Sequence, residues 1–130
     1  MATAFPPAAA IRALRGSRCG ACTTTTYPQA DTCPRCGSAA EPVELSGEGT
    51  LWTWTVQRFA PKSPPYVPPP GGFAPFVLGY VELPEGLRVA AVLNLDVDDL
   101  DWLAIGSVVR IGAEVGPDGA ANAVPRGELT

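Results

Sequence analysis

Apolar and polar residues alternate with a period of two over much of the chain after residue 43, which is typical of strands with one buried face. Turn residues separate the alternating runs. The pattern predicts five strands, over residues 49–59, 76–83, 87–95, 108–115 and 121–124. In the first of them, Trp52 and Trp54 are two positions apart, so we expect both indoles on one face of the strand.

Three other segments carry readable local patterns. The Pro-Glu-Gly sequence at residues 84–86 predicts a tight hairpin between the second and third strands. In residues 97–106, acidic positions precede a Leu-Asp-Trp-Leu run, which favours a short helix or a single helical turn. Helix-forming residues at 8–15, followed by Gly16, predict a short lead-in helix.

Five mostly antiparallel strands in a chain of this length predict a mainly β fold with a small Greek-key barrel of the OB type, since a two-sheet sandwich needs more strands. We divide the chain into a lead-in (residues 1–17), a cysteine segment (18–40) and a barrel domain (41–130). Residues 60–75, between the first two strands, contain seven prolines and two adjacent glycines. This composition predicts a comparatively stiff, proline-rich loop without helix or strand.

All four cysteines lie close together in the sequence as two C-x-x-C pairs, Cys19 with Cys22 and Cys33 with Cys36. Such pairs place their thiolates on one tetrahedral zinc ion, and the segment has too few apolar residues to fold without help. We therefore expect one structural zinc in a zinc ribbon, with no open coordination position for a catalytic water. Free or disulfide-bonded cysteines and a rubredoxin-like iron site are the alternatives.

Charge and composition narrow the classes of function. The net charge of −4 opposes binding to nucleic acid, which requires clustered cations. The chain has no histidine, so it lacks the usual partner of a serine or cysteine nucleophile, and catalysis by this chain on its own is not expected. No apolar run is long enough to span a membrane, and the first ten residues do not resemble a secretory signal. We expect a soluble protein of the reducing cytoplasm.

Several short motifs, taken in order, make the chain resemble the DUF35 family: OB-fold proteins associated with acyl-CoA that carry an N-terminal rubredoxin-like zinc ribbon. The motifs are Arg18-Cys19, Tyr27-Pro28, Cys33-Pro34-Arg35-Cys36-Gly37-Ser38, Ser46-Gly47-Glu48-Gly49-Thr50, Val81-Glu82-Leu83-Pro84-Glu85-Gly86, Asp98-Asp99-Leu100 and Ile105-Gly106-Ser107-Val108-Val109. Two positions depart from the family pattern. Thr23 stands where glycine is common, and Val124-Pro125-Arg126 replaces the usual Phe-x-Pro ending.

The resemblance implies a non-catalytic accessory subunit that binds a thiolase-superfamily enzyme. Partners of the family include thiolases, condensing enzymes and thiolase-like retro-aldolases that cleave the side chains of steroid-derived acyl-CoA thioesters. In some of these complexes the ribbon and the OB domain help to enclose the CoA. By this resemblance, the chain assembles its partner's site or holds and channels the CoA thioester.

Two sets of side chains are candidates for these contacts. Cations are needed to meet the phosphates of CoA, and the candidates are Arg18, Arg35, Arg58 and Lys62. Large aromatic side chains are enriched in protein interfaces, and the candidates for partner contact are Trp52, Trp54, Tyr66 and Phe73. For the two tryptophans, core packing and ligand stacking remain alternatives.

Two other functions stay open at this stage. Zinc ribbons and OB barrels both occur in nucleic-acid-binding modules, although the acidic charge of this chain opposes that use. A CoA thioesterase with Asp or Glu as the base is a further alternative, but a lone carboxylate is a weak base near neutral pH. The chain would also look like this if it were one domain of a longer hydratase subunit.

Overall fold

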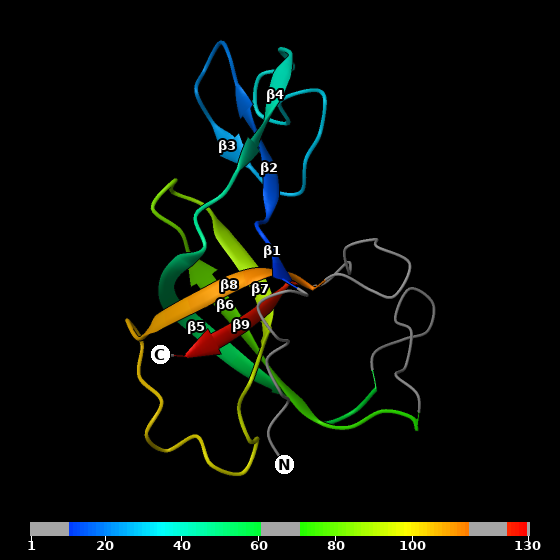
Figure 1. Cartoon of the computed structure of the whole chain (residues 1–130), viewed down its shortest axis with the longest axis vertical. Helices are drawn as coiled ribbons and strands as arrows, with labels where there is room; N and C mark the ends of the chain where they lie inside the picture. Colours follow the sequence, from blue (N-terminus) through cyan, green and yellow to red (C-terminus); the bar gives the residue numbers. More distant parts are fainter. Residues whose placement is uncertain (1–10, 61–70, 115–124, 130) are drawn as a thin grey trace.

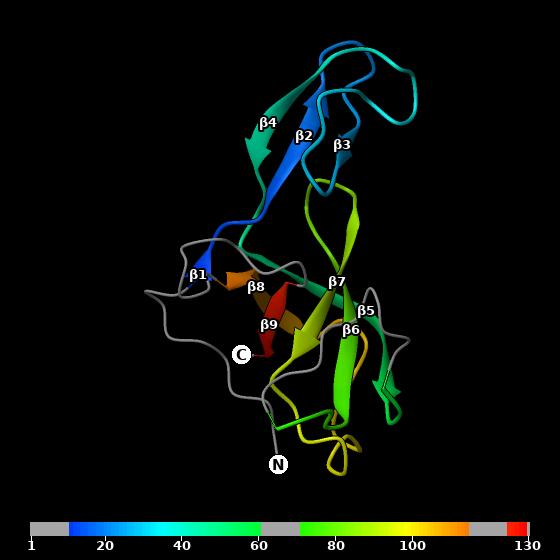
Figure 2. The same ribbon diagram turned by 90° about the vertical axis from the view of Figure 1, so that its right-hand side faces the viewer.

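The computed structural model describes residues 11–60, 71–114 and 125–129, which form nine strands in two sheets. One sheet is small and carries the cysteines, and the other closes into a barrel. Figures 1 and 2 show the small sheet standing at one end of the barrel. Among the described residues, none forms a helix that is long and apolar enough to cross a membrane.

The small sheet has three antiparallel strands in the order β3-β2-β4. Its central strand, β2 (Arg15–Cys19), pairs with β3 (Thr25–Thr26) on one side and with β4 (Ala40–Glu44) on the other. A two-residue strand, β1 (Ile11–Arg12), precedes this sheet and pairs instead with the barrel.

The barrel consists of β5 (Glu48–Gln57), β6 (Phe76–Glu82), β7 (Arg88–Leu93), β8 (Val108–Glu114) and β9 (Arg126–Leu129). Its strands follow the order β8-β5-β6-β7-β9, and pairing of β8 with β9 closes the ring. Every pair is antiparallel except β7 with β9. This is the five-stranded OB topology, so the predicted fold class is confirmed.

Alternating residues of the strands fill the barrel interior, as expected for a period of two. Its fully buried side chains include Leu51, Val77, Val81, Leu93 and Val109. At Gly49, a Cβ atom would stand only 2.4 Å from the carbonyl oxygen of Glu82, so the backbones of β5 and β6 approach too closely there for any side chain.

The expectation that Trp52 and Trp54 share one strand face is wrong. A β-bulge shifts the register of β5 against β6 between Leu51 and Thr53. One extra residue at that point reverses the alternation, because side chains on either side of a bulge no longer keep the same period. Trp54 consequently packs against the core, whereas Trp52 is 46% exposed.

Two further expectations differ from the structure, and a third concerns residues outside the described ranges. Residues 11–12 and 15–19 are strands, so the described part of the expected helix over 8–15 is extended; pairing with neighbouring strands outweighs local helix propensity. The residues of the expected fifth strand, 121–124, lie outside the described ranges, and the last described strand is 126–129. Residues 97–106 contain turns, with a hydrogen bond from the Leu103 amide to the Leu100 carbonyl (3.0 Å), and no helix.

The predicted hairpin is confirmed, and its turn is hydrogen-bonded to the segment that connects the two sheets. The amide of Gly86 donates to the carbonyl of Leu83 (2.9 Å), which closes the turn. Beside it, a carboxylate oxygen of Glu85 accepts hydrogen bonds from the amide (2.7 Å) and the hydroxyl (3.1 Å) of Ser46. Ser46 follows β4, so the hairpin contacts the segment where the chain passes from the small sheet into the barrel.

The two chain crossings between small sheet and barrel are packed together. The amide of Leu45 donates to the carbonyl of Leu14 (2.8 Å), and both side chains are buried in the main core. Tyr27, which directly follows β3, packs against the same core. The position of the small sheet on the barrel is therefore set by apolar burial as well as by chain connection.

Gly49→Ala should destabilise the barrel by about 1–3 kcal/mol, the usual cost of overpacking, because the new methyl group meets backbone that cannot move aside. Gly47→Ala is the matched control, since the nearest atom to its added Cβ is 3.9 Å away. Urea unfolding of both variants measures the difference. Equal stability of the two would contradict the close approach of β5 and β6.

Candidate metal centre

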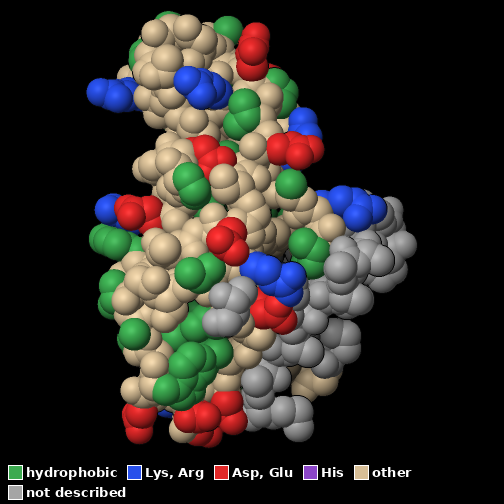
Figure 3. Space-filling view, turned by 60° about the vertical axis from the view of Figure 1, so that its left-hand side comes forward, with side chains coloured by type: hydrophobic (Ala, Val, Ile, Leu, Met, Phe, Trp, Pro, Cys, Tyr) green, Lys and Arg blue, Asp and Glu red, His purple; other side chains and the backbone are tan. Residues whose placement is uncertain are grey.

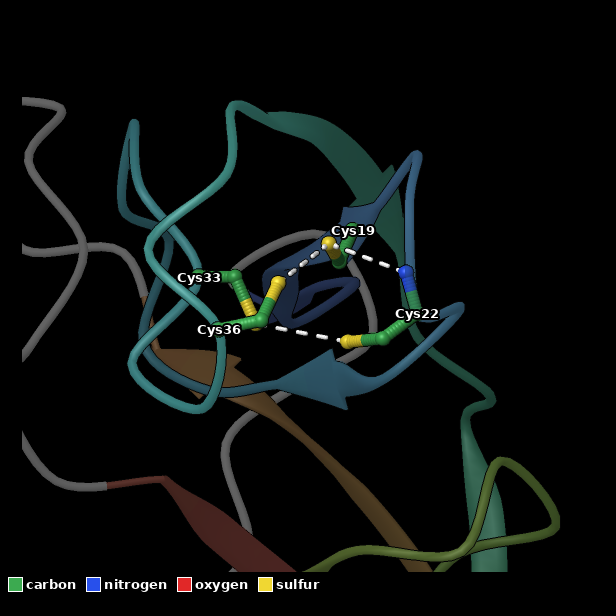
Figure 4. A group of neighbouring side chains, drawn as sticks. All are labelled: Cys19, Cys22, Cys33 and Cys36. Atoms are coloured by element: carbon green, nitrogen blue, oxygen red, sulfur yellow. Dashed lines mark hydrogen bonds between the residues drawn. The ribbon is translucent and has the colours of Figure 1, made fainter.

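The four cysteines lie on two tight turns at the far end of the small sheet. The first turn leaves the end of β2 and contains Cys19 and Cys22, and the second precedes β4 and contains Cys33 and Cys36. In Figure 4 the four side chains converge on one point between these turns. All four sulfur atoms lie within 4.8 Å of one another.

The two turns repeat the same backbone hydrogen bonds. The Cys19 amide donates to the carbonyl of Thr24 (2.9 Å), and the Cys33 amide donates to that of Ser38 (2.8 Å). In return, the amides of Thr23 (3.1 Å) and Gly37 (2.9 Å) donate to the carbonyls of Cys19 and Cys33. Thr23 and Gly37 also share a left-handed backbone, with φ of 62° and 79°. The two C-x-x-C pairs are thus equivalent turns facing each other.

The spacing of the sulfur atoms fits a tetrahedral zinc. Zn–S bonds of about 2.3 Å in a tetrahedron place neighbouring sulfurs about 3.8 Å apart. The Sγ atoms of Cys19 and Cys36 are 3.4 Å apart, and those of Cys22 and Cys33 are 3.7 Å apart. None of the four is in a disulfide. Donor type, number and spacing together make this a site for one zinc ion, as predicted.

Hydrogen bonds to the sulfur atoms favour the thiolate forms that a metal needs. The contact between Cys22 and Thr24, with Sγ and Oγ1 3.1 Å apart, lowers the pKa of the Cys22 thiol to about 6. The Ser38 amide and hydroxyl similarly lower the pKa of Cys36. At Cys19, the amides of Cys22 and Ala21 lower the pKa, but burial and the adjoining thiols outweigh them and raise it overall.

A buried serine in β2 is hydrogen-bonded to the segment between the two metal turns. Ser17, buried in β2, donates its hydroxyl to the carbonyl of Ala30 (2.7 Å) and accepts from the amide of the same residue (2.8 Å). The hydroxyl of Ser17 therefore pairs with the backbone of Ala30 as a neighbouring strand would. These two hydrogen bonds hold the segment that leads to Cys33 against β2. Four thiolates complete the coordination of zinc, so the centre is structural and offers no position for a reacting water.

Of the candidate cations that the structure describes, two lie on the ribbon and one lies beyond the end of β5. Arg18 is exposed on β2, and Arg35 lies in the second metal turn with its guanidinium 3.5 Å from the Thr24 hydroxyl. Arg58 follows β5 at the opposite end of the molecule and pairs with Asp98 at 3.9 Å (Figure 1). Lys62 lies outside the described residues.

Three of the four candidate aromatic contacts lie in the described part of the chain. Trp52 is exposed on β5, while Trp54 is partly buried and packs against the core. Phe73 is half-buried, and its ring meets that of Phe76 edge to face, with centroids 6.1 Å apart. Tyr66 lies outside the described residues. Their expected role in partner contact remains a prediction.

Comparison with known families gives the same two parts. The family model for the rubredoxin-like zinc ribbon domain of ChsH2 matches residues 8–41, and the model for the C-terminal OB-fold domain of ChsH2 matches residues 42–115. A DUF35 domain-containing scaffold protein from Methanocaldococcus jannaschii is 32% identical over 110 residues. The match covers 82% of this chain and 74% of the length of that protein. The chain belongs to the DUF35 family. The resemblance seen in the sequence motifs is thereby confirmed.

Two other relatives of this DUF35 chain are named as enzyme subunits. Benzoylsuccinyl-CoA thiolase subunit BbsA from Thauera aromatica is 33% identical and covers 73% of this chain and 65% of its own. A probable enoyl-CoA hydratase alpha subunit from Thermomonospora curvata is 36% identical over 78% of this chain, which spans 30% of that longer subunit.

Among solved structures, a chain of the Ltp2-ChsH2(DUF35) aldolase is similar to this protein. The match has a TM-score of 0.63 and 29% sequence identity, and it covers 90% of this chain and 84% of the other. Both the ribbon and the barrel of this DUF35 chain therefore have counterparts in that complex.

Sequence reasoning missed the side chains that support the metal site. Thr24 and Ser38 occupy the same place in their turns, two residues after the second cysteine of each pair. Aligning the two C-x-x-C segments with each other would have revealed this recurring hydroxyl, and it would have placed Thr23 opposite Gly37. Ser17 has no such local signal, because its partner Ala30 is 13 residues away.

Removal of zinc by a strong chelator should unfold the small sheet while the barrel keeps its structure, because the barrel has its own apolar core. Amide exchange should rise in β2, β3 and β4 and change little in β6 and β7. Unchanged protection of the small sheet in the metal-free protein would show that the four sulfurs do not stabilise it.

Thr23→Gly should stabilise the zinc-bound ribbon by about 1 kcal/mol, because a β-branched residue at positive φ is strained and glycine is not. The converse exchange, Gly37→Thr, should destabilise the equivalent turn by a similar amount. The rate of zinc transfer to a coloured chelator compares the two. A faster transfer from Thr23→Gly than from the wild type would contradict the strain at Thr23.

Proposed function

We propose that this chain is a non-catalytic accessory subunit that binds a thiolase-superfamily enzyme acting on acyl-CoA. The enzyme is a thiolase or a retro-aldolase, and the side chain of a steroid-derived CoA thioester is the substrate we favour. The observation that carries the proposal is the likeness of ribbon and barrel together to a chain of the Ltp2-ChsH2(DUF35) aldolase. Kinship with BbsA, a thiolase subunit, points to the same class of partner.

The chemical inventory of the chain supports a non-catalytic role. The sequence contains no histidine, and its four cysteines are the four ligands of the metal centre. A thiolate bound in a closed zinc shell is not available as a nucleophile. In this proposal the bond-breaking groups belong to the partner.

The second part of the proposal concerns the CoA thioester. The accessory chain completes the partner's site or holds the thioester, and its cations at Arg18, Arg35, Arg58 and Lys62 are the candidates for the CoA phosphates. Tyr66 and Phe73, both in the proline-rich loop, are candidates for contact with the partner. The complex works in the reducing cytoplasm, where thiolates keep their metal.

The proposal is tested by purifying the tagged chain from its own cells, identifying co-purifying proteins by mass spectrometry and measuring metal content. We expect a stoichiometric thiolase-superfamily protein and about one zinc per chain. The tag expressed alone controls for binding through the tag, and a variant with Cys33→Ser and Cys36→Ser controls for the metal measurement, because its ribbon cannot hold the metal. Recovery of nucleic acid in place of a protein, or thioesterase activity of the isolated chain, would overturn the proposal.

A further inference from the structure

Several large apolar side chains are exposed on the barrel surface. The described residues of this kind are Trp52, Phe59, Tyr80, Trp102, Ile105 and Val108. Phe59 lies beyond the end of β5, but the other five lie on β5, on its two neighbouring strands or in the turn before β8. Trp, Tyr and aliphatic side chains that gather on a surface mark a protein-binding site more often than isolated ones do.

Backbone pairing places Ile105 and Val108 beside Trp52. The amide of Gly106 donates to the carbonyl of Leu51, and the amide of Leu51 donates to the carbonyl of Ser107, both at 2.8 Å. One position further, Val108 stands opposite Thr50 in the register of β8 with β5. Val109 is buried, so Val108 faces outward on the same surface of the sheet as Thr50.

Tyr80 lies on the other side of Trp52. It pairs with Thr53 of β5 and sits between the buried residues Gly79 and Val81, so its ring points outward. Trp52, Tyr80, Ile105 and Val108 are therefore exposed apolar residues at neighbouring backbone positions, and we call this group the β5 patch.

Trp52 is held in place before any partner arrives. The guanidinium of Arg88 lies 3.9 Å from the centre of its ring, and the same Arg88 pairs with Glu82 at 3.3 Å. A cation stacked on an indole and fixed by a carboxylate limits the motion of both side chains. Less conformational entropy is then lost on binding, which suits a residue that anchors an interface.

Acidic residues precede Ile105 and Val108 in the chain, in the segment between β7 and β8. Asp98, Asp99 and Asp101 are exposed in the turn that leads through the exposed Trp102 to Ile105. Figure 3 shows hydrophobic side chains gathered on one side of the barrel and acidic side chains at the end farthest from the ribbon. Two copies of a chain with net charge −4 repel each other, so a partner with cations beside an apolar strip is the better complement.

We infer that the β5 patch is the surface on which the thiolase-superfamily partner docks, through an apolar strip flanked by Lys or Arg side chains. This inference rests on the proposed function and adds the place and chemistry of the contact. Trp52 is the central anchor, Ile105 and Val108 fill the area beside it, and the acidic turn accelerates association.

The test uses the thiolase-superfamily protein identified by co-purification, mixed with purified zinc-loaded variants of this chain. Trp52→Ala and Ile105→Lys should each raise the Kd at least about tenfold. Ala39→Lys, which adds the same charge at an exposed position of the ribbon, is the matched control and should leave the Kd unchanged. Zinc content and thermal unfolding confirm that each variant is folded.

The combined variant Asp99→Asn and Asp101→Asn provides a second readout. It should slow association at low salt and leave the dissociation rate nearly unchanged, as expected for charges at the rim of an interface. Increasing the salt concentration should remove the difference from the wild type.

Other outcomes separate this inference from the proposed function. If the wild-type chain holds the thiolase-superfamily protein and both patch variants bind it equally well, the docking surface is wrong and the function stands. If light scattering shows a dimer of the chain that Ile105→Lys dissociates, the patch binds a second copy and the inference is overturned. If no thiolase-superfamily protein accompanies the wild-type chain, both proposals fail.

Discussion

Tetrahedral convergence of four sulfur atoms is the constraint on which the N-terminal third of the chain depends. Between Leu14 and Leu45, the buried side chains in the described structure are those of Ser17, Cys19 and Cys33, which cannot form an apolar core of useful size. Two turns with the same hydrogen bonds bring the thiolates together, and the metal supplies the free energy that apolar burial does not.

The barrel is stabilised differently, and the two parts meet at a small apolar junction. Closure of five strands leaves no free edge in the ring, and alternate side chains fill its interior. Leu14 and Leu45 belong to this core although they flank the ribbon sheet, and Glu85 of the hairpin holds Ser46 at the crossing. The metal-dependent part is thereby presented in a fixed position by a part that does not need the metal.

Periodicity and cysteine spacing were enough to predict the zinc ribbon, the OB class of the barrel and the hairpin at residues 84–86, because alternation, paired cysteines and a Pro-Glu-Gly turn are local patterns. The strand at 126–129, which closes the barrel by pairing with β8, was not predicted. The helix expected over 8–15 failed because pairing of Ile11 and Arg12 with β8 is a contact over about 100 residues of sequence that no local pattern reveals. The expectation that Trp52 and Trp54 share one strand face failed for a similar reason. The bulge that separates them depends on how β6 pairs with β5. Of the two tryptophans only Trp52 is exposed, so the β5 patch could not be identified from the sequence.

The central claim is that this chain is a non-catalytic subunit that completes the site of another subunit, and that the other subunit carries out the reaction. The most direct measurement is the rate of acyl-CoA carbon–carbon bond cleavage by the purified thiolase-superfamily partner, with and without an equimolar amount of the zinc-loaded chain. The account predicts that the chain has no activity by itself and that its addition raises the partner's kcat or kcat/KM severalfold. Full activity of the partner without the chain, or cleavage by the chain without the partner, would contradict it.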